Sequence, residues 1–286
     1  MFAWCMLYGM NVLISILVFF SVFQLSGCSA PLVAVGIMGN IINRTADLGD
    51  ESQPYIGDTG QSFRSNEVAI SNLNLGIEYM RLGAYEEALA KLNRAKIAKP
   101  DYAPTYNTLG LLYQKMGQME EAERYFQHAI KLDDQNPTTL NNYGQFLCGQ
   151  DKETEAEKYF LTAAENPLYD MPEIPYANIG TCAYLHDQTE KAVGYFEKAL
   201  SINPRIPAAL IQLSEINYDK GNYDSAHGYL SRYLQQAKLT PRSLWLGIRI
   251  GRELGNKNAV SSYALLLRNK YPDSNEAKLL AESGIK

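Results

Sequence analysis

One pattern of small and bulky residues recurs about every 34 residues in this 286-residue chain. Each cycle opens with a glycine, followed twelve residues later by an alanine, then after four residues by leucine or phenylalanine, and after three by another alanine. The four clearest cycles open at Gly76, Gly110, Gly144 and Gly180. Small residues let two helices approach closely, and a bulky residue fills the seam between them. The pattern therefore predicts helix pairs, which must stack on one another to bury their apolar faces.

The period and the order of the residues resemble the tetratricopeptide repeat, a helix-turn-helix unit. The register places six repeats within residues 66–274, starting near Ala69, Ala103, Pro137, Glu173, Pro207 and Pro241. The fifth repeat has Ser214 at the glycine position, and the sixth keeps only a trace of the pattern around Ala264 and Leu267. Residues 275–286 read as a short amphipathic helix that can cap the open end. We therefore expect an all-α fold, a right-handed superhelix of about six tetratricopeptide repeats with a C-terminal capping helix.

The N-terminal segment is apolar from residue 2 to residue 25 and ends in Leu25-Ser26-Gly27-Cys28. Small residues before a cysteine, directly after an apolar run, resemble the lipobox of bacterial lipoproteins. The resemblance implies that residues 1–27 are a signal peptide, that Cys28 is acylated, and that residues 28–65 are a lipid-anchored linker. Ser29 after the cysteine implies sorting to the periplasmic face of the outer membrane.

The same apolar run has a second interpretation, as a transmembrane anchor. A run of 24 residues is long enough to cross a bilayer without cleavage. It also contains no Lys or Arg, whereas a secretory signal normally opens with positive charge. Both interpretations place the repeats outside the cytoplasm.

Two cysteines, Cys148 and Cys182, fall in the first helices of repeats three and four. These helices are neighbours in a repeat stack, so the two residues can form a disulfide if the compartment is oxidising. The alternative is a pair of buried free thiols, because cysteine is commonly buried.

The sequence favours a binding scaffold over an enzyme. The net charge is −5 and no basic patch is present, which argues against nucleic acid as a partner. The chain has no His-Glu-x-x-His motif, no Gly-x-Ser-x-Gly elbow and no phosphate-binding loop. We therefore expect neither catalysis nor a metal or cofactor.

The candidate binding surface is the concave face, which the first helix of each repeat contributes. The apolar residues of repeat one on this face could hold a partner, or the preceding linker could cover them. The recurring asparagines could bind a ligand backbone, or they could join neighbouring helices. The predicted groove consists of Ile70, Leu73, Asn74, Ile77, Met80, Asn107, Leu111, Gln114, Asn141 and Gln145.

A lipobox followed by six such repeats resembles the PilF/PilW family of type IV pilus biogenesis lipoproteins. Matching stretches are Asn74-Leu75-Gly76-Ile77-Glu78-Tyr79, Tyr106-Asn107-Thr108-Leu109-Gly110 and the particular run Asn141-Asn142-Tyr143-Gly144-Gln145-Phe146-Leu147-Cys148. The resemblance implies a pilotin, which escorts the secretin subunit to the outer membrane and promotes its multimerisation. The implied partners are the secretin, the lipoprotein sorting machinery, and the membrane through N-terminal acyl chains. The chain departs from the family in its uncharged start and long linker.

A second binding function also fits a lipid-anchored repeat array. Lipoprotein adaptors of the NlpI type hold cell-wall hydrolases or other envelope-assembly proteins. Pilus genes beside this one would favour the pilotin, whereas genes for cell-wall enzymes would favour the adaptor.

Overall fold

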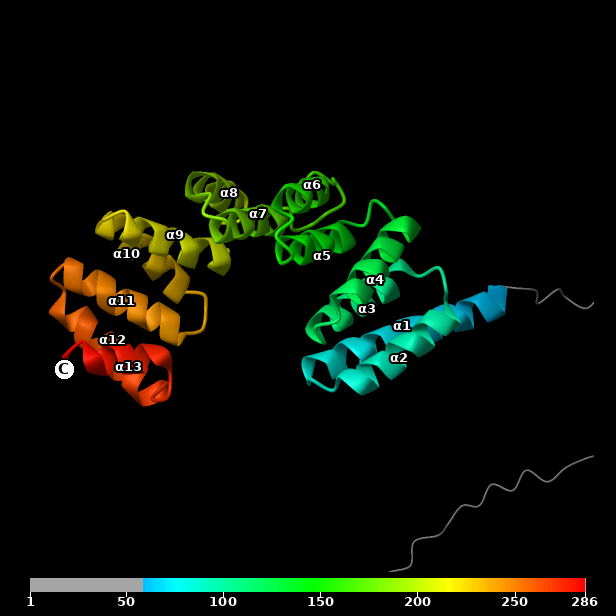
Figure 1. Ribbon diagram of the computed structural model, residues 1–286, viewed down its shortest axis with the longest axis horizontal. Coiled ribbons are helices and arrows are strands. Elements are labelled where there is room, and N and C mark those ends of the chain that lie inside the picture. Colours follow the sequence, from blue (N-terminus) through cyan, green and yellow to red (C-terminus); the bar gives the residue numbers. More distant parts are fainter. Residues whose placement is uncertain (1–58, 286) are drawn as a thin grey trace, which may run out of the picture. The chain divides into compact units, whose positions relative to one another are not determined.

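The computed structural model describes residues 59–285, which form thirteen α-helices and contain no strand (Figure 1). Six helices open the repeats: α1 (Thr59–Arg81), α3 (Ala103–Lys115), α5 (Pro137–Cys148), α7 (Glu173–Leu185), α9 (Pro207–Asp219) and α11 (Pro241–Glu253). Six helices close them: α2 (Tyr85–Ala98), α4 (Met119–Leu132), α6 (Glu153–Ala164), α8 (Thr189–Ile202), α10 (Tyr223–Leu234) and α12 (Lys257–Lys270). The last helix is α13 (Asn275–Glu282). The expected signal peptide, Cys28 and most of the expected linker lie outside the described residues.

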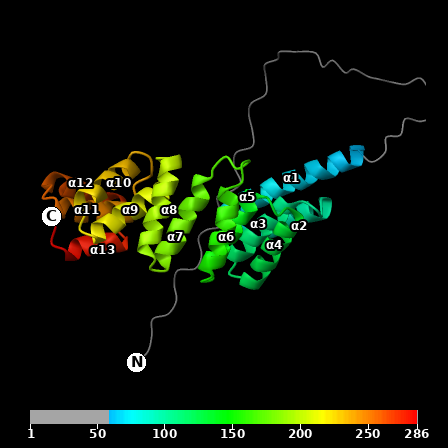
Figure 2. The same cartoon turned by 90° about the horizontal axis from the view of Figure 1, so that it is seen from above.

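Each helix pair packs on the next in chain order, and α13 packs against α11 and α12 (Figures 1 and 2). The predicted all-α solenoid of tetratricopeptide repeats is confirmed. Five of the six opening helices begin at the residue that the register predicts. The exception is α1, which begins at Thr59 inside the segment expected to be a linker. Residues 59–68 contain no proline, so they continue the helix of repeat one towards the N-terminus.

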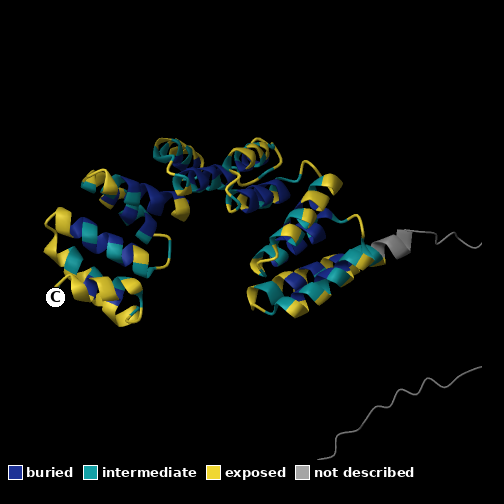
Figure 3. Cartoon of the chain, in the orientation of Figure 1, coloured by how far each residue is buried: buried dark blue, intermediate teal, exposed yellow. Residues whose placement is uncertain are grey.

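The seam between the two helices of a repeat explains the recurring glycine. A Cβ atom added at Gly110, Gly144 or Gly180 would lie 2.7 to 2.9 Å from the nearest ring atom of the phenylalanine sixteen residues later. Those rings are almost fully buried. Figure 3 shows buried segments, in dark blue, recurring in the helix pairs along the array. The aromatic ring therefore occupies the space that any other side chain would need at the glycine position.

In the sixth repeat the glycine–aromatic contact is displaced by one residue. Ile248 and Ala264 stand at the register positions of the glycine and the aromatic residue. The close contact joins the residues just before them, because a Cβ atom added at Gly247 would lie 2.8 Å from two ring atoms of Tyr263. This is why the sixth repeat shows so little of the pattern in the expected register.

The turn between the paired helices requires a positive φ angle. Four repeats place glycine there, for example Gly117 with φ of 74°. Repeats three and four instead place Asp151 and Asp187, with φ of 57° and 59°. Aspartate is among the few other residues that tolerate this conformation.

Candidate functional site

An exposed stripe on α1 is the clearest candidate for binding a partner. Ile70 and Ile77 are 46% and 39% exposed, and Asn74 between them is also exposed. Their spacing of four and three residues places them on one face of the helix. We call these three residues the α1 stripe. It offers two apolar side chains and one amide to a partner.

The structure corrects the prediction for Leu73. This side chain is only 6% exposed and belongs to a core cluster with Leu92 and Leu109. Met80 is half-buried and packs against the same cluster. Leu73 therefore holds repeats one and two together and cannot contact a partner.

Two of the predicted groove asparagines are also buried. Asn142 donates a hydrogen bond to Asn107 over 3.2 Å, and Asn178 donates one to Asn141 over 2.8 Å. Each bond joins the opening helices of two consecutive repeats, so Asn107 and Asn141 serve inter-helix packing and are not free to bind a ligand. Asn74 occupies the same position as these donors, but no repeat precedes it within residues 59–285.

The remaining groove residues are accessible to different degrees. Leu111 and Gln114 on α3 are half-buried, and Gln145 on α5 is exposed. Exposure on the predicted face is therefore greatest along α1 and less on α3.

The structure joins Cys148 of α5 and Cys182 of α7 in a disulfide, with their Cα atoms 5.9 Å apart. His186 lies beside the bridge, and its Nδ1 donates a hydrogen bond to the Cys182 carbonyl over 2.8 Å. That hydrogen bond raises the pKa of His186, partial burial opposes it, and the Asp151 carboxylate adds to the rise. The two sulfurs and the imidazole lie within 4.8 Å of one another, the spacing of a metal-ligand set. The disulfide uses both sulfurs, so the bridged form offers only the imidazole.

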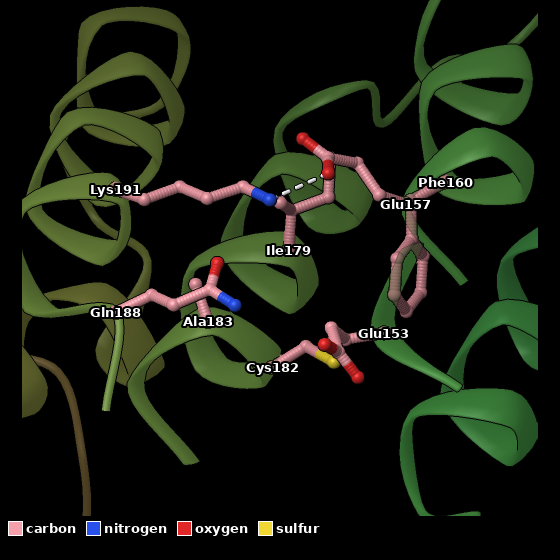
Figure 4. Close-up of a pocket in the computed structure, with 8 residues that line it drawn as sticks. All are labelled: Glu153, Glu157, Phe160, Ile179, Cys182, Ala183, Gln188 and Lys191. Carbon is pink, nitrogen blue, oxygen red and sulfur yellow. Dashed lines mark hydrogen bonds and ion pairs between the residues drawn. The ribbon is translucent and has the colours of Figure 1, made fainter. Parts of the chain in front are cut away.

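An ion pair lies near the disulfide, between repeats three and four (Figure 4). Lys191 donates to Glu157 over 2.6 Å, and the Tyr195 hydroxyl donates to the same carboxylate over 2.8 Å. Burial alone would raise the pKa of Glu157, but the bonds from Lys191 and Tyr195 outweigh it and lower the pKa. Burial, together with Glu157, raises the pKa of Tyr195 to about 12. The adjoining cavity of about 10 Å³ has room for one water molecule and is too small for a larger ligand.

We predict that Glu157→Gln lowers stability at neutral pH by about 1 kcal/mol or less, the usual range for an accessible ion pair. Because the folded-state pKa of Glu157 is lowered, its contribution is present above the unfolded-state pKa and is lost as pH falls through the folded-state pKa. Urea unfolding at pH 7 and in steps below pH 5 would measure this. The variant should differ from the parent at pH 7 and converge with it in acid. A constant difference across that range would contradict the assignment.

Sequence reasoning missed a surface cleft of about 530 Å³ formed by residues of α7, α8 and α9. It combines the 67% exposed side chain of Leu185 with several acidic residues. No sequence signal marked it, because its residues fall at helix ends in different repeats. The residues that line it are Tyr184, Leu185, Asp187, Thr189, Glu190, Ile216, Asp219 and Lys220.

No helix within residues 59–285 is both long and apolar enough to cross a membrane. The described residues form stacked helix pairs, with an exposed stripe on α1 and a surface cleft beside α7, α8 and α9. These features define a tetratricopeptide repeat scaffold. The tetratricopeptide repeat family matches residues 67–135, 107–170 and 175–206.

Among tetratricopeptide repeat proteins, this chain is similar to proteins of type IV pilus biogenesis. The type IV pilus assembly protein PilF of Pseudomonas aeruginosa is 29% identical over 245 residues, which cover 86% of this chain and 93% of the relative. A solved structure of P. aeruginosa PilF matches with a TM-score of 0.68 and 28% identity, covering 77% of this chain and 99% of that one. PilW, described as a widely conserved type IV pilus biogenesis factor, matches with a TM-score of 0.67 and 28% identity over 76% of this chain and 99% of its own. The chain is a tetratricopeptide repeat protein homologous to PilF and PilW, as its motifs predicted.

Proposed function

We propose that this protein acts in type IV pilus biogenesis as a pilotin, a non-enzymatic outer-membrane lipoprotein that binds the secretin subunit. The homology to PilF and PilW, which spans most of this chain, carries the proposal. The α1 stripe supports it, since exposed apolar side chains in line on one helix suit a protein partner. In this proposal the protein promotes secretin localisation and multimerisation.

The proposed mechanism has three parts. Acylated Cys28 engages the lipoprotein sorting machinery and anchors the chain in the outer membrane. The α1 stripe, with Gln145 and the accessible part of Leu111 and Gln114, holds a segment of the secretin. Because each delivered subunit stays near the membrane, its local concentration rises and ring assembly is favoured.

The function is tested by comparing secretin monomer and heat-resistant multimer in outer-membrane fractions. The gene would be present, deleted, or carrying Cys28→Ala. We expect deletion to remove the multimer and Cys28→Ala to mislocalise both this protein and the secretin. Unchanged multimers in all three strains would refute the pilotin function and direct the search to cell-wall hydrolases as partners.

The binding surface is tested by Ile70→Asp combined with Ile77→Asp. Each isoleucine that a partner buries contributes about 1.5–3 kcal/mol, so we expect secretin co-purification to fall by about tenfold or more. The stability of the array should change little, because both side chains are already substantially exposed. Leu73→Asp is unsuitable, since it would place a charge in the core.

The matched control is Ile202→Asp on α8. Ile202 is 45% exposed, close to the 46% of Ile70, but it lies three repeats further along the array. This control should bind the secretin like the parent. Normal secretin binding by the α1 variant would rule out the α1 stripe as the binding surface.

A further inference from the structure

The opening helix of repeat one exposes a face that every later repeat up to the fifth buries. The seventh residue of repeat one, Leu75, is 42% exposed, whereas its equivalents are 0 to 2% exposed. The tenth residue, Glu78, is exposed, whereas its equivalents are 0 to 4% exposed. The equivalents are Leu109, Tyr143, Ile179 and Leu213 at position seven, and Leu112, Phe146, Cys182 and Ile216 at position ten.

The cause of this difference is that repeat one has no preceding neighbour among residues 59–285. Leu109 and Leu112 of repeat two are buried in a cluster with Leu92 of repeat one, so this face packs on the preceding pair of helices. Within residues 59–285 no helix pair precedes α1. At the other end of the array, α13 covers the last pair and buries its own Leu280 completely. The described array is therefore capped at its C-terminal end and open at α1.

The residues along this open face have a regular order. Arg64, Val68, Ser71, Leu75 and Glu78 follow one another at intervals of four, three, four and three residues, which is one face of a helix. All five are exposed. We call them the end stripe. It lies on the opposite flank of α1 from Ile70 and Ile77, because five residues rotate a helix by about 140°.

The end stripe is complementary to itself when read backwards. In an antiparallel pairing centred on Ser71, Arg64 of one copy faces Glu78 of the other, because each lies seven residues from the centre. Val68 and Leu75 lie three and four residues from the centre, so they face each other with an offset of one residue. A small residue at the centre permits close approach of the helices, the apolar pairs flank it, and opposite charges lie outside them. Glu78 now pairs with Arg81 of its own helix at 3.1 Å, with 58% and 74% of their side chains exposed. Such an exposed ion pair contributes little to stability. Glu78 can therefore leave Arg81 and pair with Arg64 of the other copy at small cost.

From this order we infer that two copies of the protein associate through their end stripes, with the two α1 helices antiparallel across a two-fold axis at Ser71. A two-fold interface requires one surface patch to complement itself, which this stripe does. A different partner helix would require no such symmetry in the order of charges and apolar residues. The association leaves Ile70 and Ile77 of the α1 stripe open, whereas Asn74 borders the end stripe.

The first test is oxidative cross-linking of the full chain carrying Ser71→Cys, in membranes. The two-fold axis brings the two introduced sulfurs together, so mild oxidation should give a covalent species of twice the chain mass on a non-reducing gel. The parent chain reports the background from its own cysteines. Ser262→Cys on α12, which replaces another exposed serine, controls for random collision. A yield from Ser71→Cys no higher than from these controls would overturn the proposal, as would a cross-link to a different protein.

The second test exploits the predicted charge pairs. In the Ser71→Cys chain, Arg64→Glu or Glu78→Arg alone places like charges opposite each other twice, and we expect the cross-linked fraction to fall at least about threefold. The chain with both changes restores opposite charges across the axis and should recover the parent yield. Only association between identical copies is rescued by two changes in the same chain. Failure of the double variant to recover would refute this pairing.

Discussion

Reduction of the Cys148–Cys182 disulfide is expected to lower the free energy of unfolding by about 3–4 kcal/mol. The two cysteines are 34 residues apart, and a cross-link that closes a loop of this length restricts the unfolded chain by about that amount. The bridge joins α5 to α7 across the boundary where residues 165–172 form the connection between α6 and α7. Its loss removes a constraint between repeats three and four.

Urea unfolding followed by circular dichroism, with and without reductant, measures this effect. The unfolding midpoint of the parent should fall on reduction. The variant with Cys148→Ser and Cys182→Ser should unfold at the lower midpoint under both conditions. A parent chain that is insensitive to reductant, although its thiols are shown to be free, would contradict the prediction.

The second large effect is expected from Gly180→Ala in the seam of repeat four. The added Cβ would lie 2.7 Å from two ring atoms of Phe196 and 3.0 Å from a third. Phe196 is fully buried, so its ring has little room to move. Overpacking of this kind typically costs about 1–3 kcal/mol.

The matched control lies in the partner helix of the same repeat. Gly194 on α8 has no atom within 4 Å of an added Cβ. Alanine there should stabilise the helix by about 0.5–1 kcal/mol, because glycine loses more conformational freedom on folding. The same substitution should therefore have opposite signs at Gly180 and Gly194 in urea unfolding. Equal changes in stability at the two sites would mean that contact with the Phe196 ring is not the reason for a glycine at position 180.

The sequence predicted the repeat seam well because the seam is local. Gly110 and Phe126 lie sixteen residues apart within one helix pair, and their sizes are coupled by direct contact. Five opening helices begin where the register places them for the same reason. Where the contact is displaced by one residue, as at Gly247 and Tyr263, the pattern falls out of register although the packing principle is unchanged.

The candidate surface was predicted less well. Position in the repeat indicated Ile70, Leu73 and Ile77 equally, yet Leu73 is buried against repeat two while the isoleucines are exposed. The asparagines bond across 35 and 37 residues of sequence, so their role depends on how consecutive repeats are placed. Periodicity within one helix cannot distinguish a side chain that faces the next repeat from one that faces solvent.

The sequence by itself determined the all-α repeat architecture, its register and its homology to PilF and PilW. The architecture and the register depend on contacts within a helix pair. These contacts recur about every 34 residues and so appear as a pattern in the sequence. Only the tertiary structure decided which residues of a given position are exposed. Leu75 and Leu109 occupy the same position of their repeats, but only Leu109 has a preceding repeat within the described chain to bury it. Whether such a side chain is buried depends on the adjacent repeat, and the sequence of one repeat does not show which repeat lies beside it.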